Sequence, residues 1–256
     1  MTKSVRTDAV IEGRRILRVP SLFRRRHVLL PTLWGALVLG ALVLALATFA
    51  LRHLGAWLAP NEPATARDGG TARTLVVEGW LDEESLDDAV ATVARGSYER
   101  IVVSGGPIDT WRDEHRFATY AERAADYLRR HGVTRIPVVA VTAPASAQDR
   151  TFLSAVVVRD WLRQNAVAAD AIDLFSAGVH ARRSRLVYRI AFGPDVAVGV
   201  IAAAPRAYRL ERWWSTSEGA KTAVGELLSL TWTKCCFWPG PPGSHEERWA
   251  VPKSPA

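Results

Sequence analysis

The apolar and polar positions follow one pattern in the first part of the chain and another in the rest. From Val28 to Leu51 no side chain is charged and most are apolar. From Arg73 onward, short runs rich in Val and Ile alternate with longer segments in which apolar residues recur every three or four positions. The first pattern is typical of a membrane-spanning helix, and the second of a domain in which strands and helices alternate.

The second pattern predicts five strands, at 73–79, 100–106, 136–141, 171–178 and 195–204. It predicts helices at 82–95, 111–131 and about 147–165, another that begins within 175–186, and a last one at about 217–232. Strands that are apolar on both faces need helices on both sides of the sheet. We therefore expect a Rossmann-like, doubly wound α/β domain with a parallel sheet of about five strands, preceded by one transmembrane helix.

The apolar stretch 28–51 is long enough, at ~1.5 Å per residue, to exceed the ~30 Å hydrocarbon core of a bilayer. "RRRH" precedes it and only "RH" follows, so the positive-inside rule places the N-terminus in the cytoplasm. This predicts a single-pass protein of the inner (cytoplasmic) membrane with an extracytoplasmic α/β domain. A cleaved signal peptide is the alternative, because small residues stand at 45–50, although the stretch is long for one.

The remaining segments complete the predicted organisation. Residues 1–27 form a basic cytoplasmic leader, and residues 52–72, rich in Pro, Gly, Ala and Thr, form a linker. The α/β domain covers 73–235, and 236–256 form a disordered tail that contains "PGPPG". Cys235 and Cys236 are adjacent and lack metal-ligand spacing, so no metal site is predicted.

The charge distribution argues against nucleic-acid binding. The chain has a net charge of +7 and a pI near 9.9. Residues 1–27 hold eight Lys and Arg against two acidic residues, which leaves the rest of the chain close to neutral. We therefore expect no nucleic-acid partner.

Polar, glycine-rich or charged residues follow four of the predicted strands. They are Glu78 after the first strand, Ser104, Gly105 and Gly106 after the second, Asp149, Arg150 and Thr151 after the third, and His180, Arg183 and Ser184 after the fourth. In parallel α/β sheets, ligands bind beyond the carboxyl ends of the strands. The sequence therefore predicts a ligand site at this edge of the sheet.

The residue types indicate an anionic ligand. His180, Arg183 and Ser184 lie at i, i+3 and i+4 near a helix N-terminus, where a cation needs a negative partner. We predict Ser104, Gly105, Gly106, Arg150, Thr151, Arg183 and Ser184 as anion-binding residues. We predict His180, Asp149 and Glu78 as catalytic, acting as general acid or base. Glu114, Arg182 and Trp213 are further candidates.

Structural roles are the alternatives for these residues. The alternative for the basic cluster (His180, Arg182, Arg183 and Arg185) is a solvated surface, with Arg182 and Arg185 pointing away. The alternative for the glycines is a tight strand-to-helix turn. Ser146 with Asp149, and Thr110 with Asp113, each fit a helix capping box. Trp213 suits packing of the last helix against the sheet.

Six blocks, in order, resemble the YdcF/SanA/ElyC family over about residues 73–230: "LVVEGW", "IVVSGGP", "YAERAADYLRRHGV", "TAPASAQDRTFLSA", "HARRSRLVY" and "WWSTSEG". The resemblance implies a Rossmann-like domain, often tethered by an N-terminal membrane helix and linked to envelope integrity, peptidoglycan precursor or lipid-carrier metabolism, and surface polysaccharides. The family pattern falls on Gly105, Gly106, Glu114, Asp149, Arg150, Thr151, His180, Arg183 and Ser184. "QDRT" and "EGW" depart from the commoner family sequences.

Three functions follow as hypotheses. The first is a hydrolase or transferase acting on a phosphate-bearing, lipid-linked envelope or polysaccharide precursor at the membrane. The second is a non-catalytic envelope-integrity or assembly factor. The third is a binder of S-adenosylmethionine, which the resemblance associates with some members but which an extracytoplasmic location disfavours. The sequence identifies no cofactor and leaves the oligomeric state open.

Overall fold

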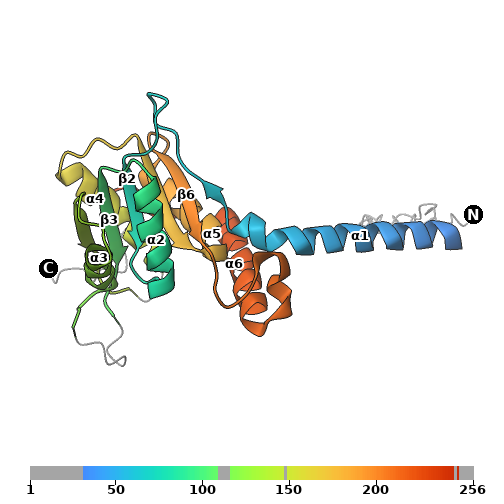
Figure 1. Cartoon of the computed structure of the whole chain (residues 1–256). Coiled ribbons are helices and arrows are strands. Elements are labelled where there is room, and N and C mark those ends of the chain that lie inside the picture. Colours follow the sequence, from blue (N-terminus) through green and yellow to red (C-terminus); the bar gives the residue numbers. More distant parts are fainter. Residues whose placement is uncertain (1–30, 109–115, 147–148, 245–246, 248–256) are drawn as a thin grey trace, which may run out of the picture. The chain divides into compact units, whose positions relative to one another are not determined.

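The computed structural model describes residues 31–108, 116–146, 149–244 and 247. The chain divides into two units, residues 1–45 and 46–256, which are described separately. Helix α1 (Leu33–Leu58) runs through this division, so its last residues, from Leu46 onward, belong to the second unit (Figure 1).

Helix α1 is the one helix in the described part of the chain that is long and apolar enough to cross a membrane. Along it Leu37, Val38 and Leu42 are more than half exposed, as expected for side chains whose partner is lipid. The predicted stretch began at Val28, which lies outside the described residues. The helix continues past the predicted end at Leu51, because Leu54 and Leu58 pack with the α/β domain.

The second unit is built on a six-stranded sheet with the order β1-β6-β5-β2-β3-β4. The strands are β1 (Asn61–Glu62), β2 (Thr74–Glu78), β3 (Arg100–Gly105), β4 (Val138–Thr142), β5 (Ala171–Ala177) and β6 (Ala197–Ala203). Strands β2 to β6 are parallel and confirm the five predicted strands, whereas β1 pairs antiparallel with β6 at the edge. The strand order reverses between β2 and β5, which is the topological switch point.

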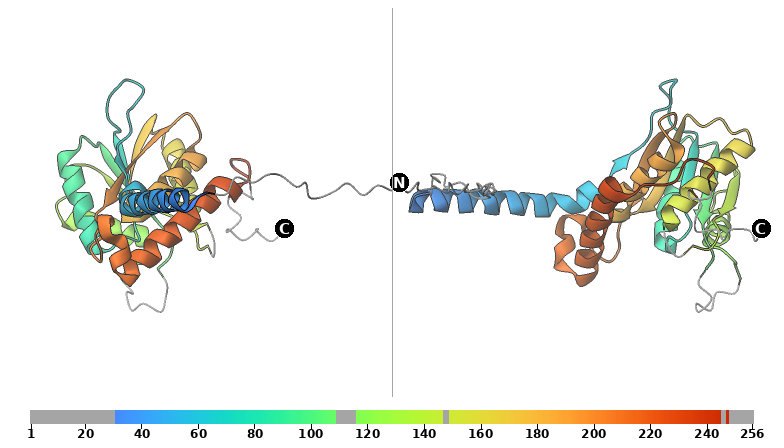
Figure 2. Two further views of the ribbon diagram at one scale, coloured as in Figure 1. Left: turned by 90° about the vertical axis from the view of Figure 1, so that its right-hand side faces the viewer. Right: turned by 180° about the vertical axis from the view of Figure 1, so that it is seen from behind.

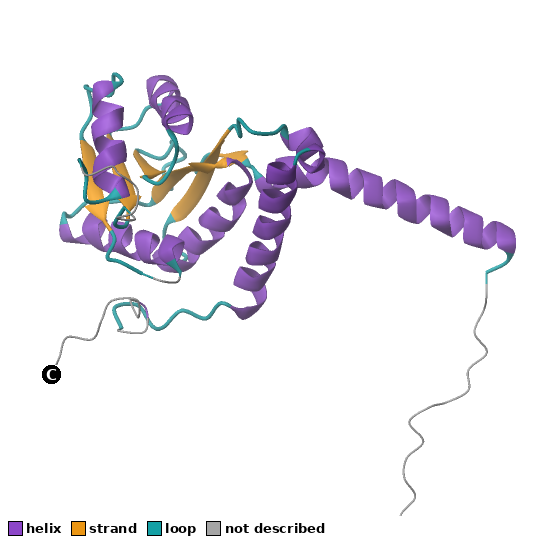
Figure 3. Ribbon diagram, turned by 90° about the horizontal axis from the view of Figure 1, so that it is seen from below, coloured by secondary structure: helices purple, strands orange, loops and turns teal. Residues whose placement is uncertain are grey.

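Helices cover both faces of this sheet, which confirms the doubly wound α/β fold. Helices α2 (Glu83–Arg95) and α3 (Tyr120–Arg130) pack on one face, where they bury Leu75 and Val77 of β2. Helices α4 (Arg150–Gln164) and α5 (Ala181–Phe192) pack on the other, where they bury Val76. Figure 3 shows these helices on either side of the strands.

A third apolar cluster joins the end of α1 to helix α6 (Ser217–Cys236) and to the short 3₁₀ segments η1 (Gly178–His180) and η2 (Leu210–Ser215). Its buried members are Leu58, Val179, Trp213, Ala223 and Leu230. Figure 2 shows α6 beside the C-terminal end of α1. At the end of α6, Cys235 and Cys236 are joined by a disulfide.

Two helices begin later than predicted. Helix α3 begins at Tyr120 because Thr119 accepts from the backbone of Glu122, whose side chain accepts from Thr119 in turn. Helix α4 begins at Arg150, and Asp149 occupies the position just before it with φ of 51°. The capping box proposed for Ser146 and Asp149 is therefore wrong, because Asp149 would have to lie inside the first turn. The alternative box at Thr110 and Asp113 lies outside the described residues.

Residues 52–72, predicted as a linker, pack on the domain instead. They contain the end of α1, strand β1 and a bridge between Thr65 and Thr71. The backbone N–H of Ala64 donates to Oδ1 of the buried Asp173 at 2.7 Å. A buried carboxylate needs such donors, so the segment is held to β5 although its composition is that of a tether.

The predicted disordered tail also makes buried contacts. Phe237 packs edge-on against Phe152 of α4, with ring centroids 5.1 Å apart. Glu247 is 3% exposed and binds the buried Arg159 through two hydrogen bonds of 2.6 and 3.0 Å. The buried Arg159 binds one carboxylate from its own helix, Asp160, and a second from Glu247. The domain therefore includes residues beyond 235.

Candidate functional site

A pocket of about 520 Å³ lies at the carboxyl ends of β2 and β3, beside the switch point. We call it the strand-end pocket. Seven of the residues predicted from the sequence line it: Glu78, Ser104, Gly105, Gly106, Arg150, Thr151 and His180. Parallel strands bring these separate segments together because all their carboxyl ends meet at one edge of the sheet.

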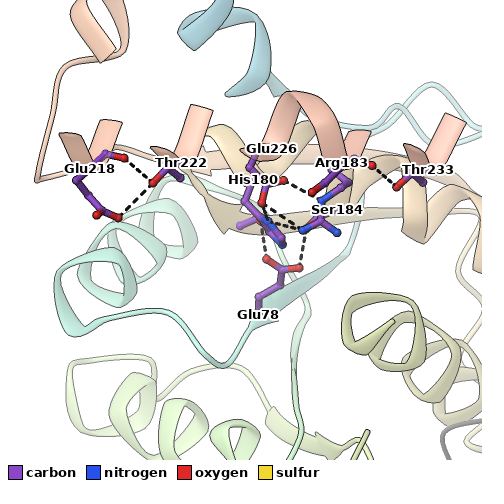
Figure 4. A network of polar contacts seen from close by, with 10 residues as sticks. Glu78, His180, Arg183, Ser184, Glu218, Thr222, Glu226 and Thr233 are labelled. Carbon is purple, nitrogen blue, oxygen red and sulfur yellow. Dashed lines mark hydrogen bonds and ion pairs between the residues drawn. The ribbon is translucent and has the colours of Figure 1, made fainter. Parts of the chain in front are cut away.

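Glu78 of β2 is held by hydroxyl groups that come from β5 and α5, across the switch point. It is 3% exposed, and its two oxygens accept from Ser176 Oγ at 2.5 Å and from Ser184 Oγ at 2.8 Å (Figure 4). Ser176 is the penultimate residue of β5 and Ser184 belongs to α5, so the Ser184 hydroxyl, predicted to bind an anionic ligand, donates here to a carboxylate of the protein. Each oxygen keeps a further lone pair, and Glu78 can still accept a proton or a ligand hydroxyl.

A second hydroxyl pair lies beside Glu78. The Tyr188 hydroxyl and Ser104 Oγ are 3.0 Å apart, and both side chains are buried. Burial, followed by the charge of Glu78, raises the pKa of Tyr188. Tyr188 is therefore a neutral hydroxyl that fixes Ser104 at the end of β3.

His180 is oriented by Glu226, a residue of α6 that sequence reasoning did not identify. Its Nδ1 is 2.8 Å from Glu226 Oε1, and its ring meets Trp80 edge-on at 5.2 Å. Nε2 is buried and has no hydrogen-bond partner among the described residues. The Arg183 Nη2 also lies 3.0 Å from Nδ1. In the tautomer with the proton on Nδ1, His180 donates to Glu226, and Nε2 is the ring nitrogen that can accept a proton.

Glu226 also neutralises Arg183. The Arg183 Nε donates to Glu226 Oε2 at 2.8 Å, and a terminal nitrogen lies 3.3 Å from Oε1 (Figure 4). Burial by itself raises the pKa of Glu226, but the hydrogen bonds and charges of His180 and Arg183 outweigh burial and lower it to about 2. The negative partner that the basic cluster needs is thus largely supplied by the protein.

Asp149 and Arg183 line a neighbouring groove of about 490 Å³ between α4, α5 and α6. We call it the α4–α6 groove. Burial raises the pKa of Asp149, and the charge of Arg183 partly opposes this shift. Arg150 and Thr151 line both the groove and the strand-end pocket, so the two cavities share one wall.

The glycines after β3 differ in their roles. A Cβ on Gly105 would stand 2.9 Å from the Ala121 nitrogen, so Gly105 permits the start of α3 to pack on the end of β3. The nearest atoms to a Cβ on Gly106 are 3.7 and 3.8 Å away. A Cβ on Gly106 would thus make only ordinary van der Waals contacts, and Gly106 lines the strand-end pocket, so its backbone is the part of the turn that a ligand can approach.

Two further candidate site residues, Arg182 and Trp213, lie away from the strand-end pocket. Arg182 donates to the Trp57 carbonyl and places its guanidinium 4.4 Å from the Trp57 ring. Trp213 is 4% exposed and donates from Nε1 to the Leu51 carbonyl at 2.9 Å. Both residues hold the end of α1, and neither lines the strand-end pocket. Glu114 lies outside the described residues.

Within the described ranges, no group of three or more His, Cys, Asp and Glu side chains could hold a metal ion. Comparisons with protein-family models, curated proteins and solved structures found no match to this chain. The fold and the pocket thus define a doubly wound α/β domain with a ligand-sized cavity at its switch point. The resemblance to the YdcF/SanA/ElyC family stays a prediction.

Proposed function

We propose that this protein binds and processes a phosphate-bearing precursor of the cell envelope or of a surface polysaccharide, as a hydrolase or transferase. The observation that carries the proposal is the composition of the strand-end pocket. A cation, a glycine turn and an imidazole with a free buried nitrogen face the same cavity of about 520 Å³.

Arg150 and the start of α4 suit an anionic group. Arg150 is the first residue of α4, and the side chain of Asp149 makes no capping bond to this helix. The first N–H groups of a helix and an adjacent guanidinium favour phosphate, because both present positive charge in fixed directions. Arg183 contributes less than the sequence suggested, since Glu226 already pairs with it.

His180 suits proton transfer. The carboxylate of Glu226 fixes the orientation of the ring through Nδ1, as a carboxylate does for the base of a hydrolytic triad. Nε2 is then the atom that takes a proton from water or an acceptor hydroxyl and returns it to the leaving group. Glu78 accepts hydrogen bonds from Ser176 of β5 and Ser184 of α5, and so holds these two elements together in the same pocket.

The membrane helix supports a lipid-linked substrate. We infer that α1 spans the cytoplasmic membrane with the leader inside and the α/β domain outside, as the charge on either side of the apolar stretch indicates. A substrate confined to the same surface meets the pocket at a high local concentration. The resemblance to envelope-associated proteins points in the same direction.

Binding by the full-length protein in nanodiscs tests this proposal. Calorimetric titrations with pyrophosphate and a polyprenyl phosphate are expected to give saturable binding that weakens at least tenfold, about 1.4 kcal/mol, in Arg150→Ala. Arg95→Ala, on the exposed end of α2, is the matched control and should bind normally. Equal affinity of wild type and Arg150→Ala would contradict the proposal.

Turnover separates the catalytic step from binding. His180→Ala is expected to retain ligand affinity within a few-fold and to lose phosphate release or transfer by 10²-fold or more, the usual contribution of a general base. Unchanged turnover in this variant would remove His180 from the mechanism.

A non-catalytic envelope factor is the second candidate, favoured by the pairing of the basic cluster. His180 and Arg183 bind Glu226, and Arg182 and Arg185 lie beside Glu62. If these contacts are purely structural, His180→Ala will complement a deletion strain fully. The S-adenosylmethionine alternative stays a prediction that a titration with that cofactor tests.

A further inference from the structure

Helix α6 exposes apolar side chains on the face opposite its buried contacts. Val224, Leu228 and Trp232 follow one another every four residues and are 44%, 66% and 49% exposed. The other face of the helix is already packed in the core through Ala223 and Leu230. A helix of a water-soluble domain normally presents polar residues to solvent, so this face requires an apolar partner.

Two lysines flank the exposed apolar side chains, and Glu218 is exposed in the first turn of α6, three positions before the first of these lysines. Lys221 and Lys234 are exposed at the two ends of the apolar face. The acidic residue between these lysines, Glu226, is turned inward and bound to His180 and Arg183. An apolar stripe flanked by lysines matches a surface that is apolar inside and anionic outside, which is the boundary between acyl chains and headgroups.

Helix α6 also lies beside the C-terminal end of α1, just beyond the apolar stretch. Arg52 is the first charged residue after the apolar stretch, and Trp57 follows about 7.5 Å further along the helix at 1.5 Å per residue. The headgroup region is about 5–8 Å deep on each side of the hydrocarbon core. The Lys234 ammonium of α6 is 5.9 Å from the Trp57 ring centroid, so the end of α6 lies at the same level.

We propose that Val224, Leu228 and Trp232 form a membrane-docking face that lays the α/β domain on the bilayer surface, with Lys221 and Lys234 at the lipid phosphates. This inference rests on the membrane span of α1 inferred above, but it goes beyond the proposed function because it needs no substrate. It also has a consequence for the site: Leu228 and Trp232 line the α4–α6 groove together with Arg150, so the groove opens toward lipid.

A fluorophore on a single cysteine tests the docking face. The label is placed at Leu228→Cys in full-length protein with Cys235→Ser and Cys236→Ser, reconstituted in nanodiscs of phosphatidylglycerol and phosphatidylcholine. The same label at Arg95→Cys, in the same background, is the matched control and also accounts for loss of the disulfide. Quenching by nitroxide-bearing acyl chains reports lipid contact, and quenching by iodide reports contact with water.

We expect nitroxide lipids to quench the label at 228 several-fold more than the label at 95, and iodide to quench it several-fold less. Equal iodide quenching at both positions would overturn the proposal. Protection from iodide without quenching by lipid would also overturn it, because a second protein copy or another partner would then cover the face. These readouts are independent of ligand binding and turnover, so they fail or succeed separately from the proposed function.

Discussion

At the scale of single residues, Glu226 determines how the basic cluster behaves. It accepts from His180 at 2.8 Å and from Arg183 at 2.8 Å, and its side chain is only 15% exposed. One buried carboxylate thus orients an imidazole and neutralises a guanidinium. Removing it leaves Arg183 without its charge partner in a region that water reaches poorly, which is more costly than the loss of an exposed ion pair.

Glu226→Gln is expected to destabilise the domain at pH 7 by about 2 kcal/mol, because the pair is partly buried and its cost lies between that of an exposed and that of a fully buried pair. Because the folded-state pKa lies near 2, below its ordinary 4.5, the charge of Glu226 stabilises the fold above pH 4.5. That contribution is lost as pH falls from 4.5 toward 2. Denaturant unfolding at pH 7 and pH 3 should therefore show a smaller difference between wild type and variant at pH 3.

Glu211→Gln is the control for this prediction. Glu211 is 67% exposed and lies 3.6 Å from Arg209, which is 79% exposed. Loss of such a surface pair costs less than about 1 kcal/mol and leaves the pH dependence unchanged. If Glu226→Gln behaves like Glu211→Gln, the carboxylate does not organise the cluster.

Local sequence could predict Glu78, Ser104 and Arg150 in one pocket because each lies at, or after, the carboxyl end of a strand in a parallel sheet. It could not predict Glu226, which is 46 positions from His180 in a helix without distinctive chemistry. A histidine and an arginine near a helix start indicate that an anion is needed. They do not indicate whether a ligand or a distant side chain of the same chain provides it.

At the scale of elements, residues 59–72, which contain β1, show that tertiary contacts can fix a segment whose composition is typical of a flexible linker. Pro, Gly and Thr at 59–72 predict a tether, but Ala64 donates to Asp173, 109 positions away. Helix starts show the same limit, since several Ser and Thr residues fit a capping pattern and only Thr119 caps α3. The alternation of strands and helices was predictable because burial on both sheet faces imposes it on every strand.

Gly199→Ala tests this edge of the sheet. A Cβ at Gly199 would collide with the Ala64 nitrogen and with Asp173 Oδ1, so we expect a loss of about 1–3 kcal/mol as the segment is displaced. Gly225→Ala in α6 meets no atom within 4 Å and should gain up to about 1 kcal/mol of helix propensity. The thermal unfolding of each variant is compared with that of the wild type. If Gly199→Ala is as stable as the wild type, residues 59–72 do not pack on β6.

At the scale of the whole molecule, the folded unit begins before and ends after the predicted limits of 73 and 235. The end of α1 contributes Leu54 and Leu58 to the cluster around Trp213, and Arg182 stacks on Trp57. The helix that is long and apolar enough to cross a membrane therefore ends in the core of the domain. Motions of the domain relative to the last turns of α1 must disrupt buried apolar contacts, which favours a fixed attachment over a flexible one.

The C-terminal segment gives a last prediction, because Glu247 supplies charge to the buried Arg159. Arg159 is 3% exposed and also donates to Asp160 and to the Ala191 carbonyl. Glu247→Ala leaves part of this guanidinium unpaired, and we expect unfolding in denaturant to require about 3 kcal/mol less. The double variant Arg159→Met, Glu247→Leu should recover most of that loss, since it removes both charges at similar volume. A chain ended at Ser244 that is as stable as the full chain would contradict this assignment.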